Sequence, residues 1–162
     1  FDYARSLACP VAIRYPNGYA ANLGSRMRIN HTMLWETLTE GDGVIVLASG
    51  ARAVGRALDA RRVSGLTNVK VINCRTVKPL DTGVLDRYAG HKIITFEEGY
   101  AAGGFGSAVA EYYAQKGEAV QLLLLGAPDA FVAHANAQEQ ADDALLTSRE
   151  LAAHIRALAQ SE

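Results

Sequence analysis

From Val44 onward the sequence alternates short, almost wholly apolar runs with segments of helical periodicity, and this alternation constrains the fold most strongly. The apolar runs, which we expect to form strands, cover residues 44–48, 69–73, 92–96 and 119–125. The helical segments cover residues 51–63, 82–88, 105–116, 138–146 and 149–160. Nearly uniform apolar strands are typical of a parallel sheet buried on both sides. The sequence therefore predicts an α/β fold: a three-layer, mostly parallel sheet with helices on both faces.

Several residues indicate where these helices begin and end. Gly65 and Gly117 follow two of them, in the position where a left-handed residue commonly ends a helix. Asp81 or Thr82 can cap the short helix that follows Pro79. Thr147, three residues before Glu150, fits a capping box for the last helix. In the helix over 51–63, we expect one face to be apolar. Its members are Ala53, Val54, Ala57, Leu58 and Val63.

The first 43 residues show no such regularity. Residues 1–8 suggest the last turns of a helix that Pro10 stops, and residues 11–15 suggest a short strand that ends at Pro16-Asn-Gly18. Residues 19–43 have no clean period, and we expect a linker containing a short strand or two. The predicted boundaries are therefore 1–18 for the end of a preceding domain, 19–43 for a linker and 44–162 for the main domain. A chain that opens on Phe1 within a helix suggests a piece of a longer protein.

The composition excludes several functional classes. The net charge of the 162 residues is −1 and the pI about 6.5, so no basic field indicates nucleic acid or an anionic membrane. No apolar run is long enough to span a bilayer. The four histidines show no metal-ligand spacing. Cys9 and Cys74 lie far apart, and we expect both to be reduced, small core residues of a cytoplasmic protein.

Gly41-Asp42-Gly43, followed 30 residues later by Asn73, has the composition of a magnesium and thiamine diphosphate motif. In the functional motif, however, the acidic residue follows a strand and leads into a helix. Here the motif precedes the strand that begins at Val44, so the cation would lie at the wrong edge of the sheet. We expect a solvated turn.

Two other segments allow both a functional and a structural interpretation. Gly103-Gly-Phe-Gly106 opens a helix and could hold a phosphate on its N–H groups, although close packing of the helix on a strand explains the glycines better. Glu97-Glu98 follows the strand over 92–96. These carboxylates could serve acid–base chemistry or bind a partner, and pairing at a surface or subunit interface is an equal alternative.

Arg14 and Arg75 are the candidate binding residues. Each follows an apolar run, and ligands of open α/β sheets gather at the carboxyl ends of the strands. A guanidinium carries a permanent charge and paired N–H donors, which suit a phosphate monoester. A salt bridge or a surface position is the alternative for either arginine.

Taken together, these segments resemble the C-terminal part of the 1-deoxy-D-xylulose-5-phosphate synthase family, thiamine diphosphate enzymes of the transketolase superfamily. The resembling stretches occur in the family's order and span nearly the whole chain. They are residues 12–18, 71–81, 94–99, 103–107 and 125–129. The first resembles the last strand of the family's middle, pyrimidine-binding domain, and residues 44–162 resemble its C-terminal domain.

The resemblance implies an enzyme that decarboxylates pyruvate and joins the two-carbon unit to D-glyceraldehyde 3-phosphate, supplying isoprenoid, thiamine and pyridoxal synthesis. It implies that Arg14 and Arg75 bind the acceptor phosphate. Thiamine diphosphate and Mg²⁺ are expected in the full-length enzyme, on domains that this chain lacks. This chain is expected to hold no catalytic, cofactor-binding or metal-binding residue, to be inactive alone, and to contribute contacts of a homodimer.

Three departures from the family pattern leave alternatives open. Asn17 replaces a basic residue, Thr76 replaces a phenylalanine, and Ala135 replaces a glycine. The alternatives are a transketolase, a pyruvate dehydrogenase beta-type domain, and a non-catalytic assembly module of the same fold.

Overall fold

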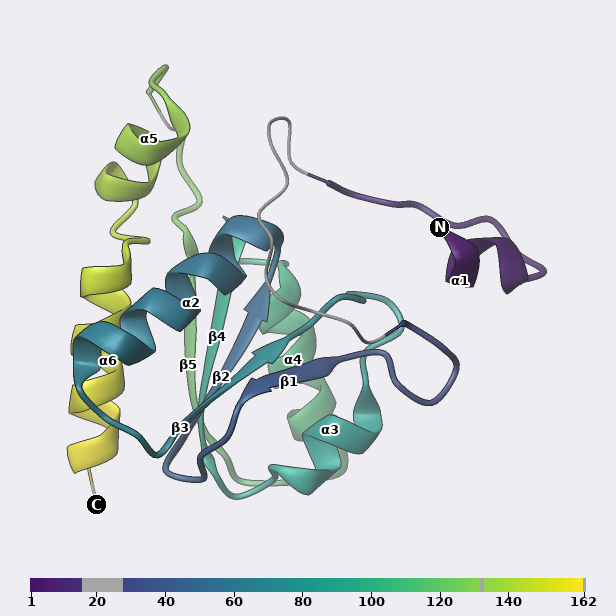
Figure 1. Cartoon of the computed structure of the whole chain (residues 1–162), viewed down its shortest axis with the longest axis horizontal. Helices are drawn as coiled ribbons and strands as arrows, with labels where there is room; N and C mark the ends of the chain where they lie inside the picture. Colours follow the sequence, from purple (N-terminus) through teal and green to yellow (C-terminus); the bar gives the residue numbers. More distant parts are fainter. Residues whose placement is uncertain (16–27, 132, 162) are drawn as a thin grey trace.

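The computed structural model describes residues 1–15, 28–131 and 133–161 of the chain. A five-stranded sheet lies at its centre, in the order β1-β3-β2-β4-β5 (Figure 1). The strands are β1 (Glu36–Thr39), β2 (Val44–Ser49), β3 (Val69–Asn73), β4 (Lys92–Tyr100) and β5 (Gln121–Ala127). β2, β3, β4 and β5 are parallel, and β1 pairs antiparallel with β3 at one edge. The mostly parallel sheet predicted from the sequence is confirmed.

Helices cover both faces of this sheet. The helices of the described residues are α1 (Asp2–Ser6), α2 (Ala51–Ser64), α3 (Thr82–Arg87), α4 (Phe105–Lys116), α5 (Ala137–Asp143) and α6 (Ser148–Gln160). α2 and α6 lie side by side on the first face, while α3 and α4 pack on the second (Figure 1). The N-terminal arm with α1 extends away from the sheet (Figure 1). The predicted three-layer α/β architecture is therefore correct.

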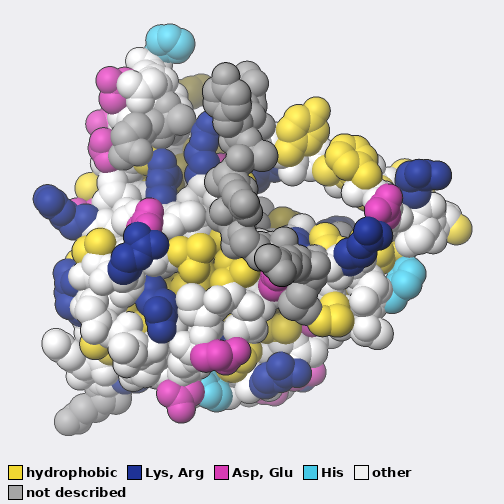
Figure 2. All heavy atoms as spheres, in the orientation of Figure 1, with side chains coloured by type: hydrophobic (Ala, Val, Ile, Leu, Met, Phe, Trp, Pro, Cys, Tyr) yellow, Lys and Arg dark blue, Asp and Glu magenta, His cyan; other side chains and the backbone are white. Residues whose placement is uncertain are grey.

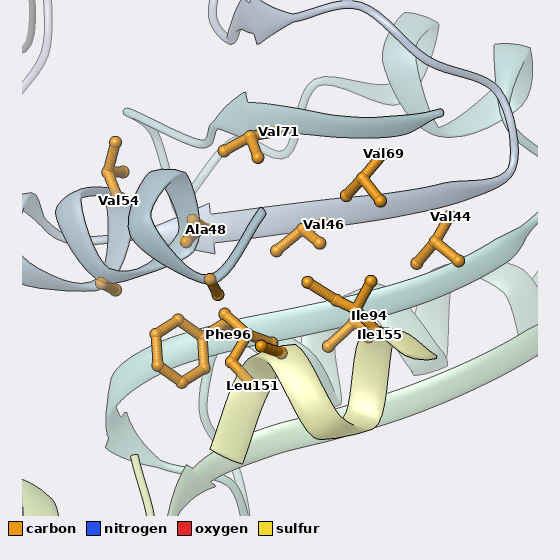
Figure 3. Packing of buried hydrophobic residues seen from close by; sticks show 14 of the residues in the cluster. Val44, Val46, Ala48, Val54, Val69, Val71, Ile94, Phe96, Leu151 and Ile155 are labelled. Atoms are coloured by element: carbon orange, nitrogen blue, oxygen red, sulfur yellow. The ribbon is translucent and has the colours of Figure 1, made fainter. Parts of the chain in front are cut away.

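The first face is packed with aliphatic side chains. Val44, Val46 and Ala48 of β2 point toward Leu151 and Ile155 of α6 (Figure 3). All five side chains are essentially inaccessible to solvent. Because neighbouring residues of a strand point to opposite faces, these alternate residues of β2 form one core and the intervening residues form another.

The second face is richer in aromatic side chains. Ile45 and Leu47 of β2 pack here with Trp35, Phe105 and Tyr113. The rings of Trp35 and Phe105 meet edge to face at 5.6 Å between centroids. Burial of both faces explains why the central strands are almost wholly apolar.

The glycine ends of α2 and α4 and the capping residues of α3 and α6 are confirmed. Gly65 and Gly117 adopt left-handed conformations directly after α2 and α4, with φ of 73° and 68°. The Asp81 side chain accepts the Val84 N–H at the start of α3, and Thr147 Oγ1 accepts the Glu150 N–H at the start of α6. Local sequence signals thus set these boundaries.

Several predictions were wrong in detail. Residues 11–15 form no strand, since no described strand lies beside them to supply ladder hydrogen bonds. Their apolar side chains are exposed on the N-terminal arm, where Figure 2 shows hydrophobic atoms at the surface. Cys9 is exposed, whereas Cys74 is buried as expected. Val63 is 57% exposed, because Ala60 and Ser64 supply the buried positions of the last turn of α2.

The remaining differences concern element lengths. β4 continues to Tyr100, so Glu97 and Glu98 lie within the strand instead of after it. α5 ends at Asp143, short of the predicted Leu146, and Leu145 beyond it has a positive φ of 55°. β1 lies inside the segment predicted as a linker with a short strand or two.

Candidate functional site

A cavity of about 620 Å³ opens at the carboxyl end of β4. It lies between the start of α4 and the loop that follows β3, the edge of the sheet at which α/β proteins bind ligands. Its charged and aromatic lining residues are Arg14, Lys78, Glu97, Tyr100, Phe105, Glu111 and Tyr112. The volume is within the range typical of small-molecule sites.

Glu97 forms one wall of this cavity and is 6% exposed. Its Oε2 accepts the Phe105 N–H at 3.0 Å, and its Oε1 accepts the Gly106 N–H at 2.8 Å. A carboxylate thus satisfies two of the first N–H groups of α4, which have no partner within the helix. The start of α4 is therefore occupied by an anion from the protein itself.

Glu98 likewise caps the start of a helix, on the opposite face of the sheet. Its Oε1 accepts the Ala53 N–H of α2 at 3.0 Å, beside the left-handed Gly50. Because Glu97 and Glu98 are consecutive in β4, their side chains point to opposite sides of the sheet. One acidic pair therefore caps one helix on each face.

The glycines before α4 permit this arrangement. A Cβ on Gly104 would lie 2.0 Å from the Tyr100 carbonyl oxygen and 2.6 Å from Glu97 Oε2. A Cβ on Gly106 would lie 2.5 Å from Thr95 Oγ1. The glycines thus allow the helix to pack closely on the strand, which is the interpretation preferred from the sequence. The N–H groups that follow them bind Glu97 instead of a phosphate.

Arg14 is brought to the cavity by the N-terminal arm. It is exposed, and it lines the cavity together with Gly99 and Tyr100. A Cβ added at Gly99 would lie 4.0 Å from Arg14 Nη1, so the guanidinium sits close to the end of β4.

Arg75 follows β3 at the same edge of the sheet, but it is not among the residues that line the cavity. Its Nε donates to the Leu34 carbonyl at 3.2 Å and its Nη2 to the Met33 carbonyl at 3.3 Å. Its Nη1 lies 3.7 Å from Glu36 Oε2. Burial lowers the pKa of the Arg75 guanidinium, and Glu36 partly offsets this shift. Arg75 therefore fastens the start of β1 to the end of β3, and the structure does not bring it together with Arg14 in one cavity.

The loop that follows Arg75 is held at both ends. Trp35 Nε1 donates to the Thr76 carbonyl at 2.8 Å, and the Trp35 N–H donates to Asp81 Oδ2 at 3.0 Å. Asp81 also caps α3. Between these anchors, Val77, Lys78 and Leu80 line the cavity. Sequence reasoning missed Trp35 and Glu97 as organisers of the site, because the side chains of both contact backbone groups of other segments.

The Gly41-Asp42-Gly43 segment lies far from this cavity. It precedes β2 on the side of the sheet where the parallel strands begin, and there the Gly43 N–H donates to the Asn68 carbonyl at 2.9 Å. Asn73 ends the parallel strand β3 at the other edge. Asp42 and Asn73 therefore cannot ligate one cation, as expected. No group of three acidic, histidine or cysteine side chains in the described part of the chain could hold a metal ion.

Comparison with known proteins agrees with the fold. The family model for the transketolase C-terminal domain matches residues 34–151. A 1-deoxy-D-xylulose-5-phosphate synthase of Chlorobium phaeovibrioides is 42% identical over 77% of this chain and 20% of its own. The one of Shouchella clausii is 35% identical over 88% of this chain and 24% of its own.

The similar solved structures are transketolases. A split-gene transketolase, described as an inactive beta4 tetramer, superposes with a TM-score of 0.70 at 25% identity, over 88% of this chain and 46% of its own. The transketolase of Leishmania mexicana superposes with a TM-score of 0.55 at 21% identity, over 78% of this chain and 18% of its own, and supports the fold alone.

This chain spans between 20% and 25% of the length of the curated relatives that it matches. No helix among the described residues combines the length and apolar character needed to cross a membrane. The sheet order, the helices on both faces and the family match over residues 34–151 lead to one conclusion. The chain belongs to the transketolase C-terminal domain family.

Proposed function

We propose that this chain acts as the C-terminal domain of a thiamine diphosphate-dependent 1-deoxy-D-xylulose-5-phosphate synthase. The complete enzyme would convert pyruvate and D-glyceraldehyde 3-phosphate into 1-deoxy-D-xylulose 5-phosphate and CO₂. The identity of 42% and 35% to two synthases favours this reaction over that of a transketolase. The domain's own contribution would be acceptor-phosphate binding and contacts within a homodimer.

The observation that carries this proposal is the cavity at the carboxyl end of β4, with Arg14 in its lining. An exposed guanidinium at this edge suits a phosphate monoester, because it stays charged and offers paired N–H donors. We retain Arg14 and Arg75 as the candidate residues for the acceptor phosphate. Arg75 would act from the carboxyl end of β3, where it also holds the segment before β1.

Thiamine diphosphate and Mg²⁺ would be held by the parts of the enzyme that correspond to the remainder of the relatives. Two acidic side chains considered from the sequence offer no cation site: Glu97 is committed to the N–H groups of α4, and Asp42 lies at the opposite edge of the sheet. Residues 1–18 would end the preceding, pyrimidine-binding domain, and residues 19–43 would link it to this one. The complete enzyme would be a cytoplasmic homodimer.

The first experiment compares the protein encoded by the intact gene with this chain alone. Each is incubated with pyruvate, D-glyceraldehyde 3-phosphate, thiamine diphosphate and Mg²⁺, and 1-deoxy-D-xylulose 5-phosphate is measured. Product from the full protein and none from this chain is the expected result. If the full protein instead transfers two carbons from a ketose phosphate and leaves pyruvate untouched, it is a transketolase. If it does neither, a non-catalytic module of the same fold replaces the proposal.

A second experiment tests the arginines. Arg14→Ala and Arg75→Ala in the full protein should each raise the KM for glyceraldehyde 3-phosphate about tenfold or more, with the KM for pyruvate nearly unchanged, because a charge-assisted contact to phosphate is lost. Equal effects on both substrates would contradict the assignment. Because Arg75 also anchors the segment before β1, its variant is first checked for an unchanged unfolding midpoint.

A further inference from the structure

The loop between β3 and α3 places a second cation in the cavity that contains Arg14. Lys78 lines this cavity, and its side chain is exposed. Neither the Lys78 ammonium nor the Arg14 guanidinium forms an ion pair with any residue that the structure describes. Arg75 differs, because its guanidinium already contacts two carbonyls and a carboxylate. Arg14 and Lys78 are thus the two lining cations without an ion pair in the described chain.

The remaining charges of the cavity increase the need for a second cation. The start of α4, which could otherwise attract an anionic ligand, is already neutralised by Glu97. Glu111 is exposed and also lines the cavity, so it repels an anion. A phosphate that enters this cavity therefore depends on side-chain cations, and a single arginine would face an unfavourable carboxylate.

The backbone that carries Lys78 is well anchored. Trp35 holds the Thr76 carbonyl on one side, and Asp81 is fixed on the other side by the Trp35 and Val84 N–H groups. Pro79, directly after Lys78, restricts the chain further. An ammonium on a loop fixed at both ends loses little backbone freedom when it binds a ligand.

We propose that Lys78 is a direct ligand of the acceptor's phosphate group, acting together with Arg14. This inference rests on the proposed function, and it names a specificity residue outside the predicted pair of arginines. Lys78 supplies a compact charge, while Arg14 supplies a planar pair of donors. Both would act on the phosphate and neither on the carbonyl of the acceptor.

The test uses Lys78→Gln in the full protein, with Lys92→Gln as the matched control. Lys92 begins β4 at the opposite edge of the sheet. Lys78→Gln should raise the KM for glyceraldehyde 3-phosphate about tenfold. It should leave the KM for pyruvate and the rate with unphosphorylated glyceraldehyde nearly unchanged. Lys78→Arg should restore much of the loss, and Lys92→Gln should behave like the wild type. Equal KM values for glyceraldehyde 3-phosphate in the two glutamine variants would overturn the proposal.

A binding measurement separates this inference from the proposed reaction. Titration calorimetry of the full protein with inorganic phosphate measures phosphate binding and requires no turnover. Weaker phosphate binding by Lys78→Gln than by Lys92→Gln would support the cation site even if pyruvate is not a substrate. Equal phosphate binding by both variants would reject Lys78 as a ligand, even if the synthase activity is present.

Discussion

The two faces of the sheet share the same strands but are built differently. On the first face, α2 and α6 cover a core of valine, alanine, leucine and isoleucine side chains together with Phe96. On the second face, α3 and α4 cover a core that includes Trp35, Phe105 and Tyr113, and the cavity opens beside it. The first face is joined mainly by apolar packing, whereas the second combines packing with polar contacts to the loops around the cavity.

This difference shows how one sheet can be both a stable scaffold and a support for a binding site. Aliphatic side chains fill space without polar atoms that need partners. Tryptophan and tyrosine fill more space and also carry one donor each, which here reaches the Thr76 and Leu85 carbonyls. The aromatic face can therefore fix the backbone of the loop after β3 and of α3 at defined positions, and this is the face on which the cavity forms.

The largest expected effects come from truncating one core residue on each face. Phe105→Ala should lower the free energy of unfolding by about 4 kcal/mol and Leu151→Ala by about 3 kcal/mol, because both side chains are almost fully buried. Trp35, the one tryptophan of the sequence, contacts the Phe105 ring. Denaturant titration gives the free energies, and native-state tryptophan emission should change in Phe105→Ala alone. An equal emission change in Leu151→Ala would show that the two cores are not independent.

The two glutamates of β4 give a more precise comparison. Glu97→Ala should cost about 2–3 kcal/mol, because two N–H groups at a buried helix start lose their partner. Glu98→Ala should cost about 1 kcal/mol, since this half-buried side chain is seen to accept one N–H. Unfolding midpoints in urea measure both.

Glutamine at the same positions is the matched control. Glu97 uses both of its oxygens, so Glu97→Gln would direct an NH₂ group at an N–H and should cost nearly as much as alanine. Glu98→Gln keeps the oxygen that the Ala53 N–H needs and should change stability by less than about 0.5 kcal/mol. Equal costs for the two glutamine variants would mean that charge, and not the number of accepted hydrogen bonds, determines the effect.

The fold could be predicted correctly from the sequence where the signal is local or periodic. The apolar runs at Val44–Ser49 and Val69–Asn73 have to be buried on both sides, and Gly65 and Thr147 act within one turn of the helices that they end or begin. The prediction failed for residues 11–15, because a strand depends on a neighbour as well as on its own side chains.

The candidate site was harder to predict for the same reason. Arg14 and Arg75 were both expected at strand ends, but whether their side chains meet depends on contacts from residues remote in sequence. Arg75 contacts the carbonyls of Met33 and Leu34, which no side-chain pattern reveals. Two consecutive glutamates at the end of a strand, each facing the glycine-marked start of a helix, are the signal that could have identified the caps.

The smallest predicted effect is a difference between the two faces in how their contribution to stability depends on pH. On the second face, Asp86 of α3 accepts a hydrogen bond from Tyr112 Oη at 2.5 Å and forms an ion pair with Lys116 of α4. These contacts, of which that with Lys116 is the largest, hold the pKa of Asp86 below its usual 3.8. A lowered pKa contributes stability that is present above about pH 3.8 and is lost as the pH falls through the folded value. The contribution is small, because the pair is exposed and screened by salt.

On the first face, Arg156 of α6 donates to the Val63 carbonyl of α2, and this contact involves no carboxylate. The stability difference between wild type and Asp86→Asn should therefore shrink from pH 5 to about pH 2.5, whereas that between wild type and Arg156→Gln should stay constant. Thermal midpoints across this range measure both differences. A constant difference for Asp86→Asn would mean that its carboxylate contributes through packing alone, and the contrast between a helix contact with a carboxylate and one without would be lost.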